Sequence, residues 1–146
     1  MNFKQVILSG LIAGFIGFIV GSTLYLNPLV SDIYTEYGNW PGAKPMEDVG
    51  GIVNWMILML FGGLFSTVFL AMLYDYAEKG IFASRPWKKG IFFGFLVWLV
   101  YKIPMSYYIW LMYKVPDILN IIETFNGLIG SLVVGYVLAI LHEKLK

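Results

Sequence analysis

The sequence predicts an all-α integral membrane protein that folds as a bundle of four transmembrane helices. Hydrophobic residues make up 59% of the 146 residues and charged residues only 13%, which leaves too little polar surface to cover a soluble globule. A spanning helix needs about 20 largely apolar residues. Four continuous apolar runs meet this length and predict a single membrane domain of residues 1–146: 6–26, 50–74, 90–113 and 118–141. Their continuity favours helices over the alternating strands of a membrane barrel.

Composition also excludes several kinds of functional site. The chain has no cysteine, which excludes disulfides and thiolate metal sites. Its formal net charge of +1 gives no reason to expect a nucleic-acid partner. No motif for nucleotide binding, zinc proteolysis or a nucleophile elbow is present, and the single histidine, His142, is expected to cap the end of the last helix. We therefore expect no catalytic residue, no metal and no cofactor.

The first apolar run, residues 6–26, is longer than the roughly 7 to 15 apolar residues of a signal peptide, so we expect a retained helix. Small residues at four-residue intervals let another helix approach closely. The first run carries such a helix-packing strip at Gly10, Gly14, Gly17 and Gly21.

The first outer loop, residues 27–49, begins with Asn27 and Pro28, a pair that ends one helix and suits the start of another. Apolar residues recur at helical spacing over residues 28–37, with polar residues on the other side. This pattern predicts a short helix lying at the membrane interface. Residues 38–45 are rich in turn-forming glycine and proline.

The distribution of charge predicts the orientation. Short loops rich in lysine and arginine remain in the cytoplasm. The loop 75–89 is basic, whereas the outer loop 27–49 and the outer turn 114–117 together contain two lysines and five acids. We therefore expect a multi-pass protein of the cell membrane with both termini cytoplasmic. The basic residues on that side are Lys4, Lys79, Arg85, Lys88, Lys89, Lys144 and Lys146.

A weak internal similarity suggests a 2+2 parallel repeat. Residues 10–15 resemble residues 90–95, and residues 61–64 resemble residues 125–128. Two hairpins with the same topology would be related by a pseudo-twofold axis along the membrane normal.

Two charges stand inside the apolar runs, and Lys102 is the deeper. It lies 13 residues after Lys89 and 12 before Lys114, about 18 Å from either end of its helix. A charge near the midplane costs about 2.5 to 3.5 kcal/mol and is expected to face the interior, a partner or water. Pro104 removes a backbone donor, so the carbonyl of Val100 is one candidate partner.

Glu123 is the second charge, about 9 Å inside the outer boundary. Asn120 and Asn126 stand three residues away on either side and share its helix face. Asn54 in the second helix lies at similar depth, so we expect these side chains to form a polar pocket in the outer half. Further along the fourth helix, Gly127, Ser131 and Gly135 form a second helix-packing strip.

Helical geometry argues against a direct Lys102–Glu123 pair. Side chains lean toward the N-terminus of their own helix. The third helix runs outward and the fourth inward, so the ammonium and the carboxylate are expected to lean apart. We predict a connection through water or Asn126, with Lys102 leaning toward Ser66 or Thr67.

Two functions are compatible with this sequence. The first is a non-enzymatic accessory or scaffold subunit, which docks other membrane protein subunits or a second copy through its glycine strips and Lys102. The alternative is a small dimeric transporter or proton-linked permease, which uses Lys102, Glu123, Asn54 and Asn126 as its site. The lipid bilayer is the expected environment in both cases.

Overall fold

A computed structural model describes residues 2–145, and Lys146, counted above among the basic residues, lies outside this range. Helices and turns without any strand make up the described residues. Four helical segments are long and apolar enough to cross a membrane. The helices are α1 (Phe3–Leu26), α2 (Pro28–Tyr37), α3 (Ile52–Ala77), α4 (Pro86–Val97), α5 (Ile103–Met112) and α6 (Asp117–Lys144), with short turns η1 (Met46–Val49) and η2 (Glu78–Gly80) and the π-helical η3 (Trp98–Lys102).

The helices extend beyond the apolar runs at several ends, and two of them begin at residues that suit a helix start. Asn2 caps α1 by accepting a hydrogen bond from the Gln5 amide, 3.4 Å away, so that helix begins at Phe3. Pro86 is the first residue of α4, where its missing N–H costs nothing, and the third segment therefore begins before residue 90. This segment consists of α4, η3 and α5 in continuous succession.

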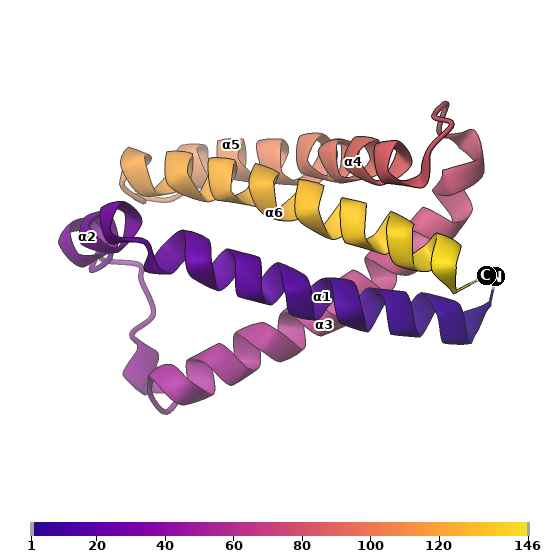
Figure 1. Cartoon of the computed structure of the whole chain (residues 1–146). Helices are drawn as coiled ribbons and strands as arrows, with labels where there is room; N and C mark the ends of the chain where they lie inside the picture. The colour runs from indigo at the N-terminus through magenta and orange to yellow at the C-terminus, as the bar shows by residue number, and fades with distance from the viewer. Residues whose placement is uncertain (1, 146) are drawn as a thin grey trace.

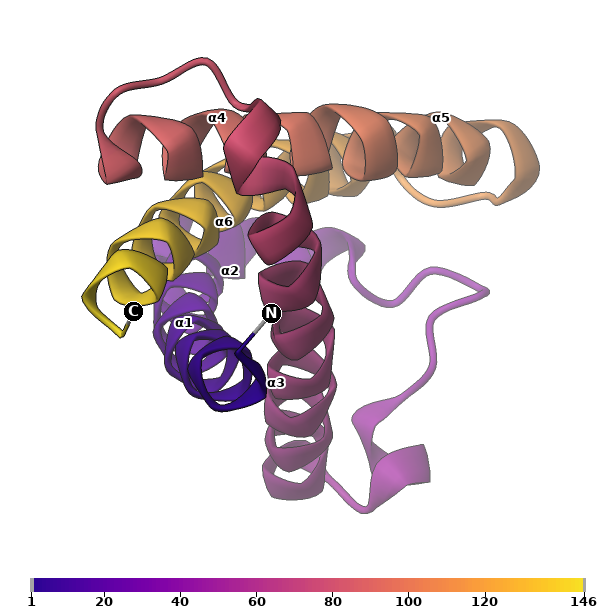
Figure 2. The same cartoon turned by 90° about the vertical axis from the view of Figure 1, so that its right-hand side faces the viewer.

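The four segments form an open bundle with α6 near its centre. Figure 1 shows α6 between α1 and the α4–α5 segment, and both neighbours contact it. The segment α3 crosses α1, and its outer half then swings away from the other helices (Figure 2). We call α1 with α3 the first hairpin, and α4–α5 with α6 the second hairpin. The first hairpin is splayed at the end where the second is closed.

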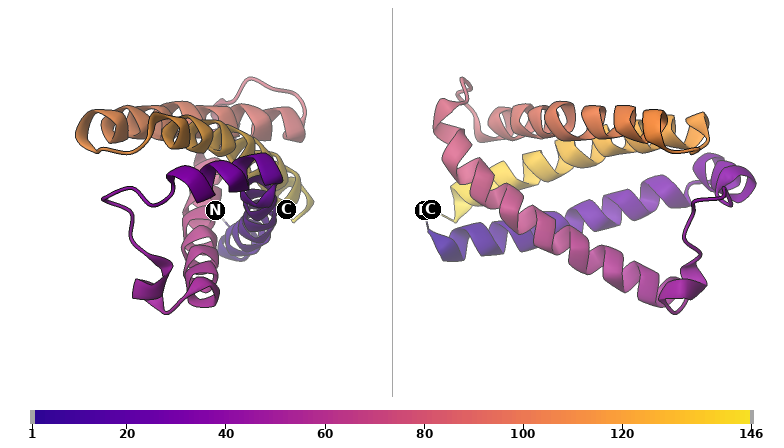
Figure 3. Two further views of the ribbon diagram at one scale, coloured as in Figure 1. Left: turned by 90° about the vertical axis from the view of Figure 1, so that its left-hand side faces the viewer. Right: turned by 180° about the vertical axis from the view of Figure 1, so that it is seen from behind.

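Both chain ends lie at the same end of the molecule, as an even number of spans requires (Figure 1). The basic segment 78–89 lies there too, whereas α2 and η1 lie at the opposite end (Figure 3). We name these the terminal end and the outer end. The structure thus separates the basic loop from the acidic one.

The expected short helix in the first outer loop is present as α2. The Asn27 side chain accepts a hydrogen bond from the Val30 amide at 3.1 Å, and Pro28 occupies the first helical position. Asn27 therefore ends α1 and caps α2 at once. In Figure 3 the helix turns across the outer end of α1, an orientation suited to a membrane interface.

Glycines bring the helices together in the terminal half. A Cβ added to Gly10 would lie 2.7 Å from the Val68 Cα, and one added to Gly14 would lie 2.2 Å from the Thr67 Oγ1. These two glycines therefore allow α1 to cross α3 closely. Gly21, which we expected in the same strip, has open space at its Cβ position, because no other helix among residues 2–145 comes within 4 Å of it.

The second hairpin is held by a closer contact of the same kind. A Cβ on Gly90 would lie 2.3 Å from the Gly135 carbonyl oxygen, and one on Gly94 would lie 2.2 Å from the Ser131 carbonyl oxygen. Here backbone meets backbone, so neither helix has room to adjust. A third contact joins α1 to α6, where a Cβ on Gly17 would lie 2.7 Å from the Val134 Cγ2.

Candidate functional site

A polar cluster surrounds the carboxylate of Glu123 on α6. The Tyr25 hydroxyl at the end of α1 donates to Oε2 at 2.8 Å, and the Tyr34 hydroxyl on α2 donates to Oε1. The Lys102 Nζ lies 3.6 Å from Oε2. Three donors from α1, α2 and η3 thus converge on one carboxylate, and hydrogen bonds to an ionised group are among the strongest in proteins.

The direct contact between Lys102 and Glu123 corrects the expected geometry. We predicted a bridged arrangement, with the lysine leaning toward Ser66 or Thr67. Instead, both hydroxyls donate to carbonyl oxygens of their own helix, α3, and the ammonium faces the carboxylate. At 3.6 Å the pair is an ion pair rather than a close charge-assisted hydrogen bond, which spans about 2.7 to 2.9 Å.

Two local features bring the ammonium to this position. Lys102 ends the π-helical turn η3, in which the Ile103 amide donates to the Trp98 carbonyl, and Pro104 lies two residues later in the first turn of α5. The wider turn changes the direction of the side chain relative to a regular helix. Gly127 supplies the second feature, because a Cβ there would lie 3.1 Å from the Lys102 Cγ and Cε. The expected packing glycine therefore makes room for the lysine stem.

The cluster is partly accessible. The side chain of Glu123 is 40% exposed and that of Lys102 is 23% exposed. Tyr34 lies outside the membrane-spanning segments, where burial and the neighbouring Glu123 carboxylate raise the pKa of its phenol above the ordinary value. The phenol therefore remains a hydrogen-bond donor to Glu123 over the physiological pH range.

The three asparagines that we expected in one pocket lie in different surroundings. The Asn120 Nδ2 donates to the Ser106 carbonyl of α5 at 2.9 Å. The Asn126 Nδ2 is buried and has no hydrogen-bond acceptor among residues 2–145. Asn54 is exposed next to Gly50, at the splayed end of α3, so the fold does not bring it to Glu123. The pocket expected from depth alone does not form, because α3 diverges after crossing α1.

Sequence reasoning did not select several of the residues that hold this region together. The Trp98 Nε1 donates to the Thr124 carbonyl at 2.9 Å, and the Thr124 and Ser106 hydroxyl oxygens lie 2.6 Å apart. Tyr25 and Tyr34 were also missed. A tyrosine on the apolar face of α2 was a signal, because a buried phenol needs a hydrogen-bond partner, but the partner depends on how the helices pack.

A second polar cluster lies at the terminal end. His142 is 1% exposed, and its Nε2 lies 3.1 Å from the Asp75 Oδ1 and 3.9 Å from the Glu78 Oε1. Its ring packs edge-on against Tyr74, with centroids 5.5 Å apart, and the Gln5 side chain donates to its carbonyl oxygen. The expected capping role is therefore wrong. The imidazole enters the interior and joins α6 to the end of α3.

Two hollows among the described residues lie away from Glu123. A cavity of about 210 Å³ lies among α3, α4 and α6, lined by Thr67, Phe93 and Ser131 among others. A groove of about 450 Å³ follows the outside of α4 near its start. The polar cluster is a set of bonded side chains from α1, α2, η3 and α6.

Four apolar helical segments, joined by glycine contacts and two polar clusters, define a small multi-pass helical membrane protein. No protein family, curated protein or solved structure matches this chain.

Proposed function

We propose that the protein is a non-enzymatic accessory subunit of the cell membrane that docks a transmembrane helix of another protein against the outer half of α3. The observation that carries this proposal is the splay of α3, which leaves its outer half without packing partners among α4, α5 and α6 (Figure 2). We place both termini and the basic loop on the cytoplasmic side, in accordance with the positive-inside rule.

The exposed face of α3 suits close helix packing. At Gly62 and Gly63, nothing among residues 2–145 other than the nearby backbone of α3 lies within 4 Å of an added Cβ, and the Ser66 hydroxyl is bonded to its own helix. On the same side of α3 as Gly62, the side chains of Phe61 and Phe65 are 65% and 68% exposed. Lipid tails are as apolar as these side chains, so helices associate in membranes chiefly through van der Waals packing over small residues. Such a face favours a helix over lipid.

The polar cluster has a supporting role in this proposal. Glu123 accepts hydrogen bonds from α1 and α2 and forms an ion pair with Lys102 of η3. It therefore holds these three elements against α6 in the outer half. These contacts hold the rest of the outer half together, and they do not include α3.

Site-specific photo-crosslinking in native membranes tests the proposal. A photoreactive residue at Phe65 is expected to trap a different membrane protein, and one at Phe125, 63% exposed on α6, is not. Gly62→Ile should abolish the crosslink, whereas Gly130→Ile, which also has open space at its Cβ position, should preserve it. An adduct at Phe65 with a second copy of this chain, or with lipid alone, would contradict the proposal.

One observation favours the alternative of proton-linked transport. The side chains of Lys102 and Glu123 remain 23% and 40% exposed, so the protein does not seal the charged pair completely. In that case Lys102→Met and Glu123→Gln should each abolish proton flux or uptake in proteoliposomes. Unchanged flux in both variants would refute the transport alternative, and only the accessory role would remain.

A further inference from the structure

The groove on the outside of α4 combines apolar walls with a basic rim. Its walls come from Ile91, Phe92 and Phe95 of α4 and Leu132 of α6, and Trp87 and Lys88 stand at its terminal end. These α4 residues repeat at intervals of three and four, so they share one helix face over about 12 Å. Since α4 belongs to a spanning segment, the groove runs in the direction of the lipid chains.

The walls face outward rather than into the protein. Trp87, Ile91, Phe92 and Phe95 are between 37% and 49% exposed. The groove has a volume of about 450 Å³, which lies in the range of small-ligand sites. The open side is the surface that the bilayer covers, so an apolar chain enters it without leaving the membrane.

Among the described residues, Lys88 and Arg85 at the rim form no ion pair. The Lys88 Nζ lies 5.5 Å from the centroid of the Trp87 ring, which holds the ammonium at the mouth of the groove. The ion pairs within residues 2–145 involve Lys102 and His142, and neither Lys88 nor Arg85 takes part. The first turn of α4 contains no acidic residue. Lys89 differs, because its ammonium donates to the Glu78 carbonyl at 3.1 Å.

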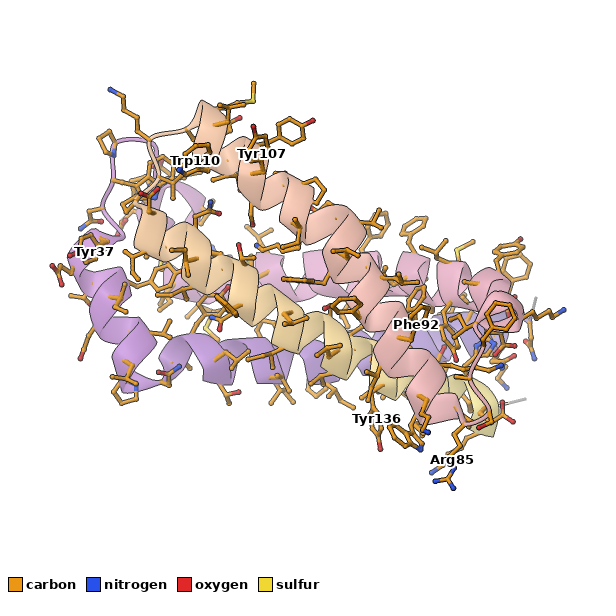
Figure 4. All side chains as sticks on the ribbon, turned by 90° about the horizontal axis from the view of Figure 1, so that it is seen from above. Tyr37, Arg85, Phe92, Tyr107, Trp110 and Tyr136 are labelled. Carbon is orange, nitrogen blue, oxygen red and sulfur yellow. The ribbon has the colours of Figure 1, made fainter. Side chains whose placement is uncertain are left out.

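Figure 4 shows where Arg85 lies relative to α4 and α6. Arg85 projects beyond the start of α4, at the end of the molecule where Phe92 of α4 and Tyr136 of α6 also lie. Tryptophan and tyrosine gather at the level of lipid headgroups, and basic residues beside them attract anionic lipids. The rim therefore lies where a headgroup phosphate is found.

We propose that this groove binds one anionic phospholipid, with an acyl chain along Phe92, Phe95 and Leu132 and the phosphate between Lys88 and Arg85. A zwitterionic lipid fills the same apolar walls but carries a cation that Lys88 and Arg85 repel. The site thus selects by headgroup charge, and the groove supplies the affinity that a dissolved phosphate lacks.

Native mass spectrometry of the detergent-solubilised full chain tests this proposal by titration with phosphatidylglycerol and with phosphatidylcholine. The wild type is expected to retain phosphatidylglycerol preferentially. Lys88→Gln should weaken its binding about fivefold, and Arg85→Gln about fivefold again, with phosphatidylcholine binding unchanged. Lys79→Gln removes a charge from the same loop but not from the rim, and it should have no effect.

The walls are tested separately. Leu132→Trp should fill the groove and lower retention of both lipids, while Phe69→Ala, at an exposed ring of α3, should change neither. Size-exclusion profiles and circular dichroism must match the wild type for each variant. The proposal is overturned if Lys79→Gln weakens phosphatidylglycerol as much as Lys88→Gln, which indicates diffuse electrostatics. It is also overturned if inorganic phosphate alone displaces the lipid, or if Leu132→Trp leaves retention unchanged.

Discussion

The two hairpins of this protein begin alike and end differently. In each, the first helix crosses the second on a pair of glycines, Gly10 and Gly14 in α1 and Gly90 and Gly94 in α4. Beyond the crossing, α4–α5 stays with α6 as far as the outer turn, whereas α3 separates from α1 (Figure 3). The comparison shows that a glycine crossing brings two helices together at one point only.

Two further features keep the second hairpin closed. Its helices are joined by the short turn between Met112 and Asp117, while 14 residues separate α2 from α3. Its outer half also has interhelical hydrogen bonds through Trp98, Ser106 and Asn120. Lipid exerts no hydrophobic force between apolar helices, so such polar contacts and chain constraints decide where packing continues.

The largest expected effect tests the backbone contact of the second hairpin. Gly90→Val should destabilise the fold by about 3 kcal/mol, because the new Cβ would lie 2.3 Å from the Gly135 carbonyl and 2.7 Å from the Ala139 Cβ. Unfolding in mixed detergent micelles measures the loss. Gly62→Val, at a position with open space, serves as the control and should change the free energy of unfolding little. Equal losses in both would show that the crossing has no special role.

The link between the hairpins at the terminal end comes next. His142→Leu should lower the free energy of unfolding by about 2 kcal/mol. The leucine cannot pair with the Asp75 carboxylate, which follows the buried Tyr74 in α3. Lys144→Gln, an exposed residue in the same turn of α6, should have no measurable effect. Hydrogen exchange at the end of α3 should rise in the His142 variant alone. Unchanged exchange there would refute the link.

The Lys102–Glu123 contact should give a smaller value. A double-mutant cycle of Lys102→Met and Glu123→Gln is expected to give a coupling energy of about 1 kcal/mol, because the atoms are 3.6 Å apart and both side chains are partly exposed. The same cycle with Lys114 in place of Lys102 is the control. A coupling of zero would mean that Tyr25 and Tyr34 alone hold the carboxylate.

The smallest effect concerns a single hydroxyl in the outer half. Thr124→Val keeps the shape of the side chain but removes the contact with Ser106, and it should cost about 0.6 kcal/mol. Thr23→Val is the matched control, since the Thr23 hydroxyl bonds only to its own helix. If both variants behave like the wild type, the Ser106–Thr124 contact does not help to close the second hairpin.

Sequence reasoning predicted the four spanning segments and the short helix after Pro28, because length, continuous apolarity and capping residues are local properties. It also selected Lys102 and Glu123, since charges in apolar runs are conspicuous. It failed on their geometry, because the π-turn before Pro104 and the bare surface of Gly127 redirect the lysine. It placed Asn54 in a pocket by depth alone, and it assigned His142 to a cap from its position near a helix end.

The sequence by itself determined which segments cross the membrane, how basic and acidic loops are divided, and that two intramembrane charges need partners. Only the tertiary structure decided which partners they find, that α3 departs from the other helices and that His142 is buried. The physical reason is that α1 and α3 are apolar on every side, and such a helix has no face marked for the interior. In lipid its neighbours are therefore selected by shape, by a few glycines and by the rare polar group that another helix can satisfy.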